Sequence, residues 1–242
     1  MAVSKSRGTP ALKAIEQDAA GVPDVYCHQV IKETVALHAA LLSVYPGNLR
    51  VIGVLEHQAR VLLSHFKLKD EAVCVQLSNW LPECIGLDAA GIFRQDLTIH
   101  HMRLAVAREH GFESWRAAEA NGNTKLDAQF EAAVDAALSG NLKKLDELIR
   151  AKPALATQRS QFGHGATLLI YMAANGVETW RQVVPANAAS VLQYLLDAGA
   201  DPEAKISVYG GLHSTLELLL SSAHPRAAGV LDDMARVLSR EG

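Results

Sequence analysis

The 242-residue sequence contains little of what marks several protein classes. Its three cysteines, Cys27, Cys74 and Cys84, are far apart and form no Cys-x-x-Cys, so neither a disulfide framework nor a zinc knuckle is expected. No apolar run reaches the ~20 residues that span a bilayer, and the polar start of the chain lacks the apolar region of a signal peptide. These absences predict a cytoplasmic protein with reduced thiols and no membrane segment.

An excess of charge of one sign is also absent. The 23 basic and 26 acidic residues give a formal net charge of −3, and the two halves of the chain are each nearly balanced. Nucleic acids and anionic membranes attract proteins largely through clustered basic residues. The composition therefore predicts a protein that binds neither nucleic acid nor a membrane surface.

Aromatic residues make up only 5% of the chain, whereas Ala and Leu are frequent, and this mixture favours helices. Apolar residues recur at helical spacing in the first half, beginning with Ile31, Val35, His38 and Leu42. No segment alternates with the period of two that is typical of a strand. The pattern predicts an all-α protein with a flexible tail over residues 1–10 and a helical domain over residues 11–122.

Three polar residues stand where helices of this domain are expected to begin. Asp70, Asp96 and Ser114 each precede an apolar stripe of helical spacing, and their side chains are suited to cap a helix N-terminus. The domain is expected to end at residues 121–123, Asn-Gly-Asn, which are the best candidate for a linker.

A recurring unit of two helices follows over residues 127–242. Each unit has an inner helix that ends in a small residue and an outer helix that ends in large apolar residues. The inner helices end at Gly140, Gly176 and Ala223, which are 36 and 47 residues apart. A helix pair cannot bury its apolar face alone, so such units are expected to stack on one another.

Two segments of the second unit resemble the ankyrin repeat. Residues 167–176 follow the family's Thr-Pro-Leu-His-x-Ala-Ala-x-x-Gly, with Leu168 in place of Pro and Ile170 in place of His. Residues 195–202 match its Leu-Leu-x-x-Gly-Ala-Asp-Pro ending, in which Gly199 suits the exit from a helix. The resemblance implies about three repeats, at ~33 residues each in the family, that form a short helical solenoid after the N-terminal domain.

Residues 96–242 also look like a bacterial ankyrin subfamily that carries inserted loops. Residues 222–229, Ser-Ala-His-Pro-Arg-Ala-Ala-Gly, resemble one of its segments, and residues 104–115 resemble a helix-turn segment that often precedes such repeats. This likeness implies a fold and a mode of use, namely binding through the hairpin tips and the inner helices, and it identifies no partner.

The second unit is longer than the family repeat because of an insertion at residues 177–187. Insertions in repeats map to loops on one face, often the binding face, and Trp and Arg are enriched at interface hot spots. The alternative is that Trp180 covers a small core of the insertion itself, and that the hairpin tips are solvated turns. The expected partner-binding residues in the insertion, the tips and the inner helix are Arg159, Gln161, His164, Tyr171, Trp180, Arg181, Gln182, Tyr209 and His213.

Motifs for catalysis are missing. There is no Gly-x-Ser-x-Gly, no His-Glu-x-x-His and no phosphate loop around Gly210. The sequence therefore predicts a non-catalytic module that binds another protein, either as an adaptor or as an inhibitor or immunity-type binder, without cofactor or metal. The alternative is an enzyme or metal protein whose site lies in the N-terminal domain, where His57, His65 and His100 or His101 would converge.

Overall fold

The computed structural model describes residues 23–45 and 49–239 of the chain. The structure is mostly helical, with 59% helix and 7% strand, which confirms the all-α class at the level of helical content. The tail expected over residues 1–10 and the first part of the expected helical domain, residues 11–22, lie outside the described residues.

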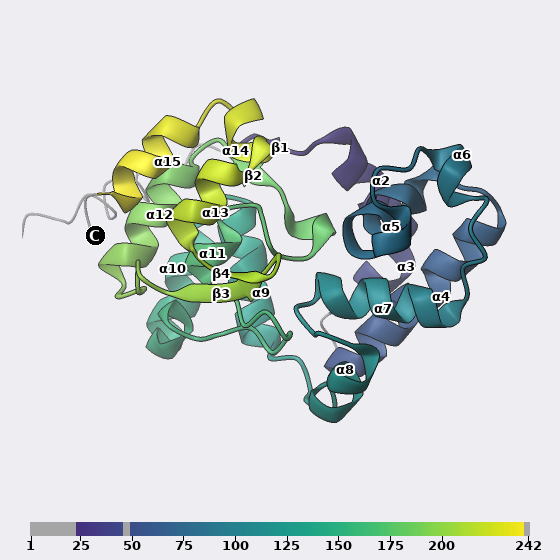
Figure 1. Ribbon diagram of the computed structural model, residues 1–242. Helices are drawn as coiled ribbons and strands as arrows, with labels where there is room; N and C mark the ends of the chain where they lie inside the picture. The colour runs from purple at the N-terminus through teal and green to yellow at the C-terminus, as the bar shows by residue number, and fades with distance from the viewer. Residues whose placement is uncertain (1–22, 46–48, 240–242) are drawn as a thin grey trace, which may run out of the picture.

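The N-terminal half is a bundle of helices joined by short 3-10 turns (Figure 1). Its α-helices are α2 (Gln29–Leu37), α3 (Ala39–Leu42), α4 (Val51–Lys67), α5 (Cys74–Trp80), α6 (Ala89–Ile92), α7 (Ile99–Glu109) and α8 (Trp115–Asn121). Helix α7 packs against both α4 and α5. Val54, Leu77 and Met102, one from each helix, are fully buried in the core of this half.

Two of the three expected helix caps are confirmed. The Asp70 carboxylate accepts the backbone N–H of Ala72 at 3.0 Å, and the Ser114 hydroxyl accepts that of Ala117 at 3.2 Å. The expectation for Asp96 is wrong, because α7 begins later and its N-cap is Thr98. A cap must stand directly before the first helical residue for its side chain to reach the free N–H groups.

The expected linker is part of the N-terminal fold. The carbonyl of Gly122 accepts the N–H of Ile52 at 2.8 Å, and that of Thr124 accepts the N–H of Val51 at 3.0 Å. Arg50 and Lys125 also form an isolated antiparallel bridge. The chain is therefore held against the start of α4 as it enters the second half.

The C-terminal half contains helices in successive pairs around a second core. They are α9 (Ala128–Leu138) with α10 (Leu142–Ala151), α11 (Leu168–Tyr171) with α12 (Ala188–Asp197), and α13 (Thr215–Ser221) with α15 (Leu231–Leu238), with α14 (Ala223–Ala227) between the last two. Helix α11 contacts both α9 and α13, and α12 contacts α15. Gly199 follows α12 with a φ of 93°, as its expected role at a helix exit requires.

Two small antiparallel strand pairs were not expected from the sequence. Strand β1 (Val25–Tyr26) pairs with β2 (Val184–Pro185), and β3 (Lys205–Val208) forms a hairpin with β4 (Gly211–Ser214). Residues of β3 alternate between exposed and buried, but four residues are too few for this period to stand out in a sequence.

The insertion at residues 177–187 lies between the two halves of the molecule. It contains the 3-10 helix η5 (Thr179–Arg181), which packs against α2, and then strand β2, which pairs with β1 near the start of the described chain. The insertion thus joins the repeat half to the N-terminal half.

Candidate functional site

The nine residues expected to bind a partner differ in how far they are buried. Arg159 and Tyr209 are exposed, and Gln161, Gln182 and His213 are partly buried. The other four are buried: His164, Tyr171, Trp180 and Arg181. Each of the four keeps at most 7% of its surface exposed, so none of them provides the exposed contact surface that was expected.

The insertion is buried because the N-terminal half covers it. Trp180 keeps only 7% of its surface exposed, and its ring lies 6.0 Å from that of His38 and 5.6 Å from that of His110. These neighbours come from α2 and α7, so Trp180 is neither a free anchor nor the centre of a separate small core.

Arg181 is the centre of a buried ionic cluster. Its Nη1 lies 2.7 Å from Glu131 and 3.5 Å from Glu178, and its Nη2 lies 3.2 Å from Asp135. Its guanidinium also stands 5.2 Å from the ring centre of Tyr45 and 5.5 Å from that of Tyr171. Three carboxylates and two aromatic faces thus hold one cation at the domain interface.

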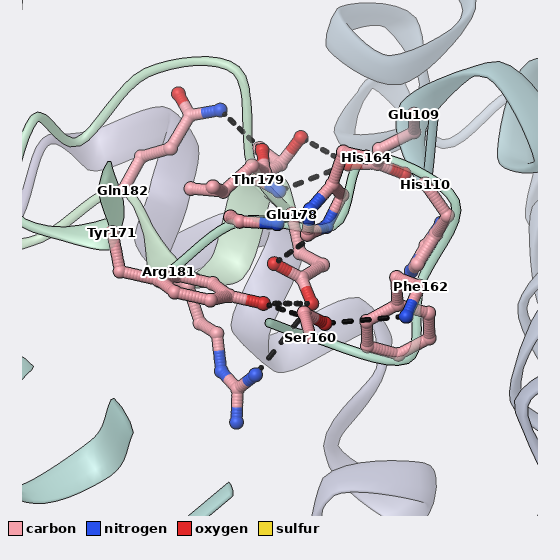
Figure 2. A network of polar contacts seen from close by, with 12 residues as sticks. Glu109, His110, Ser160, Phe162, His164, Tyr171, Glu178, Thr179, Arg181 and Gln182 are labelled. Atoms are coloured by element: carbon pink, nitrogen blue, oxygen red, sulfur yellow. Dashed lines mark hydrogen bonds and ion pairs between the residues drawn. The ribbon is translucent and has the colours of Figure 1, made fainter. Parts of the chain in front are cut away.

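Glu178 joins this cluster to a buried histidine. In Figure 2 its carboxylate lies between the ring of His164 and the hydroxyl of Tyr171, which donates to it at 3.1 Å. His164 accepts the N–H of Ala166 through Nδ1, so its Nε2 carries the proton and faces Glu178 at 3.7 Å. Burial raises the pKa of Glu178, but the nearby His164 ring and the charge of Arg181 bring it down to about 2.

Burial raises the pKa of two other members of the cluster, Glu131 and Tyr171. It raises the pKa of Glu131, against the opposing effects of Arg181 and Tyr45, and it raises the pKa of Tyr171 well above its ordinary value. Glu131 therefore takes up a proton more readily than Glu178. The Tyr45 hydroxyl donates a hydrogen bond to the Glu131 carboxylate at 2.5 Å.

A second polar chain crosses the same interface. His38 donates through Nε2 to Gln76 at 3.0 Å, and Gln76 donates to Glu109 at 2.7 Å. The other oxygen of Glu109 accepts the backbone N–H of Thr179 at 3.0 Å and also its hydroxyl. Gln76 and Glu109 come from α5 and α7 and Thr179 from the insertion, so this chain also ties the two halves together.

These groups join distant segments of the chain inside the molecule. The side chains of His164 and Glu178 are fully buried, so a substrate has no access to them. Among the described residues, no group of three or more His, Cys, Asp or Glu side chains is placed to hold a metal ion. Two of the histidines considered as ligands have other contacts: His65 lies 2.8 Å from Asp70, and His101 lies 3.6 Å from Glu83.

A cavity of about 340 Å³ opens beside the cluster, between α2, α3, α9 and the insertion. Val35, Leu42 and Leu138 supply apolar walls, and Arg181 and Asp135 supply the charged part. Because Arg181 is already neutralised by carboxylates, the cavity offers no unpaired cation to an acidic ligand.

A groove of about 430 Å³ lies between the β3–β4 hairpin and the N-terminal half. Its lining comprises Trp80, Arg108, Gly111, Phe112, Glu113, Ser207, Val208, Tyr209 and Gly210. Such a volume is within the ~300–1,000 Å³ that is usual for binding clefts. The hairpin points toward α7 in Figure 1, so residues 100 positions apart in the sequence face each other across this groove.

Tyr209 occupies the tip of the hairpin in a conformation that costs energy. Its φ is 54° and that of Gly210 is 75°, which makes a two-residue turn of the mirror-image type. Side chains other than glycine, asparagine and aspartate rarely adopt such a φ. Tyr209 is kept there by stacking on Trp80, with ring centres 5.7 Å apart at 11°, and by donating to Asn175 at 2.9 Å.

Several residues of the buried ionic cluster and of the groove were not predicted from the sequence. Glu131 carried a signal, because it shares a helical face with Val134 and Leu138, which are buried, and a carboxylate on an apolar face needs a buried partner. Trp80 and Ser207 carried none: their neighbours in the groove come from distant parts of the chain.

Comparison of the chain with protein-family models, with curated proteins and with solved structures finds no match in any of the three. None of the helices in the described ranges is long and apolar enough to cross a membrane. The geometry of the groove and of the buried clusters is therefore the basis for a functional assignment.

Proposed function

We propose that the protein is a non-catalytic recognition module that binds another protein in the groove between the β3–β4 hairpin and the N-terminal half. The observation that carries this proposal is Tyr209, which is 56% exposed at the tip of the hairpin although its backbone conformation is unfavourable for tyrosine. Strained residues often mark binding sites, because selection for contact outweighs the local cost.

The arrangement of helix pairs supports an ankyrin-type stack as the framework of this module. Inner helices α9, α11 and α13 contact one another in chain order, and a β-hairpin precedes the third pair. Leu195 is buried and Leu148 and Val237 are partly buried against the same core, each in the last part of an outer helix. Equivalent positions in successive pairs are what a stacked repeat requires.

The composition of the groove supports a protein as the partner. Aromatic and arginine side chains are the residue types that contribute most to protein interfaces, and Trp80, Tyr209 and Arg108 supply them here. The groove is also open along the hairpin, where Arg159 is exposed. The insertion has a different role in this proposal: it fixes the N-terminal half, which supplies the second wall of the groove, against the repeats.

Site-specific photo-cross-linking tests the proposal. A photoreactive phenylalanine analogue is placed at Tyr209 in one sample and at Leu68, which is 74% exposed on the N-terminal half, in the other. In a lysate of the cells that make the protein, we expect a discrete adduct with one protein from position 209 and none from position 68. The captured protein is then purified and its Kd is measured.

The variant Tyr209→Asn should weaken this Kd about tenfold or more, as expected for loss of an aromatic anchor. Asparagine accepts a positive φ, so the turn is retained. Leu68→Ser serves as the matched control and should leave the Kd unchanged. Equal adducts from both positions, or a Kd that Tyr209→Asn leaves intact, would refute binding in this groove.

A further inference from the structure

The register of the β3–β4 hairpin leaves backbone groups of Ser207 directed away from β4. Val208 and Gly211 flank the two-residue turn and form the hydrogen-bonded pair that closes it. In an antiparallel ladder hydrogen-bonded and non-hydrogen-bonded pairs alternate, so Ser207 and Leu212 form a non-hydrogen-bonded pair. The N–H and C=O of Ser207 therefore point outward from the free edge of β3.

Two contacts at the next non-hydrogen-bonded pair agree with this register. The carbonyl of Lys205 accepts a hydrogen bond from Arg159 at 3.1 Å, and the N–H of Ser214 donates to Glu217 at 2.7 Å, so both point away from the partner strand. Arg159 thus covers the edge at Lys205. No group in the described part of the chain covers it at Ser207, which lines the groove.

The charges around this edge include three cations and fewer exposed carboxylates. Arg108 lines the groove together with Glu113, and Arg159 and Lys205 are exposed at the start of β3, where Glu217 lies close to Lys205. Arg108 is held in position by donating to the backbone carbonyl of Trp80 at 3.0 Å. An acidic segment therefore fits the groove better than a basic one.

We infer that the groove takes a short extended acidic peptide of a partner protein, which adds as a strand to the edge of β3 at Ser207. The inference rests on the proposed function and specifies its mode. An extended segment along residues 206–209 spans roughly 10 Å, or about four residues. Its main chain exchanges two hydrogen bonds with Ser207, its acidic side chains lie near Arg108 and Arg159, and an apolar side chain packs beside Tyr209.

Selection from a displayed library of random linear peptides against the full chain supplies the probe. We expect the selected peptides to be enriched in Asp and Glu and to contain one large apolar residue. Binding of a labelled selected peptide is then measured by fluorescence anisotropy for the wild type, Ser207→Pro and Ser207→Ala. Proline removes the outward N–H and places a ring where the added strand would lie, whereas alanine keeps the N–H.

Ser207→Pro should weaken peptide binding about tenfold or more, and Ser207→Ala should leave it unchanged. The hairpin does not use the N–H of Ser207, so both variants should keep the wild-type melting temperature. If the proline variant unfolds, a second test uses peptides that are each methylated at one backbone nitrogen. Methylation of at least one position should weaken binding by a similar factor. Protection of the Ser207 amide from hydrogen exchange by the peptide gives an independent measurement.

Equal binding to Ser207→Pro and Ser207→Ala overturns the inference, and so does selection of basic peptides. A concentration-dependent dimer of the chain that Ser207→Pro abolishes also overturns it, because a second copy would then occupy the edge. If cross-linking from Tyr209 identifies a partner whose Kd Ser207→Pro does not change, strand addition is wrong while the proposed groove stands. If no partner is found there, the proposed function itself fails.

Discussion

Replacement of Arg181 by methionine tests whether the buried ionic cluster holds the two halves together. Methionine keeps most of the volume of the side chain but removes the charge that Glu131 and Glu178 face at 2.7 and 3.5 Å. Both carboxylate side chains are fully buried, and removal of one partner from a buried ion pair costs about 3–5 kcal/mol. We expect the free energy of unfolding to fall by about 4 kcal/mol, a large part of the ~5–15 kcal/mol typical of a domain.

Urea denaturation at pH 7, followed by tryptophan fluorescence, measures this loss, because Trp180 lies next to Arg181 in the interface. Asp135→Asn is the matched control: Asp135 pairs with the same guanidinium at 3.2 Å, but its side chain is 61% exposed. An exposed partner contributes only about 0–1 kcal/mol. The double variant Arg181→Met with Glu131→Gln should be more stable than Arg181→Met alone, because one uncompensated charge is removed with the cation.

The pH dependence of this loss has a definite sign. Without Arg181 the pKa of Glu131, which burial already raises, rises further, and that of Glu178 rises above its unfolded value, so protonation at low pH stabilises the folded variant. The difference in stability between wild type and Arg181→Met should therefore shrink between pH 8 and pH 5. A cost below about 1 kcal/mol, equal to that of Asp135→Asn, would show that the cluster does not hold the interface.

Three further predictions concern single groups. Thr179→Val removes the hydroxyl that Glu109 accepts but keeps the backbone N–H, so urea denaturation should show a loss of about 1–3 kcal/mol for a buried acceptor that loses a donor. The pKa of His110 is lowered, chiefly by burial. The contribution of His110 to stability is therefore complete above the unfolded pKa of about 6.5 and is lost as pH falls below that value. The melting temperature should drop from pH 7 to pH 5, and it should drop less in His110→Gln, whose side chain does not titrate. Burial raises the pKa of Cys74 to about 11, so iodoacetamide at pH 8 should modify it slowly until urea unfolds the protein; rapid modification of the native protein would contradict this.

Several elements could be predicted from the sequence because their causes are local. The spacing of apolar residues predicted a helical first half, and Asp70 and Ser114 cap helices because their side chains reach N–H groups two or three residues away. Gly199 was assigned to a helix exit from its place in an eight-residue motif and has the positive φ that this requires.

The site could be predicted only in part. Arg159 and Tyr209 were expected at hairpin tips and are exposed; Tyr209 lines the proposed groove, and Arg159 contacts the carbonyl of Lys205 at the start of β3. Trp180 and Arg181 were expected at the surface because they lie in an insertion that a repeat does not need for its own core. Their burial depends on contacts with residues up to about 140 positions away in the sequence, among them Tyr45 and His38.

The sequence by itself determined that the chain is mostly helical, where some of the helices begin, and that helix pairs recur in the second half. Only the tertiary structure decided which polar residues are inside and which backbone edge is free. The physical reason is the range of the interactions. Helical periodicity and caps act over about four residues, whereas the partners of Arg181 and the open edge at Ser207 are set by how two separately formed cores come together.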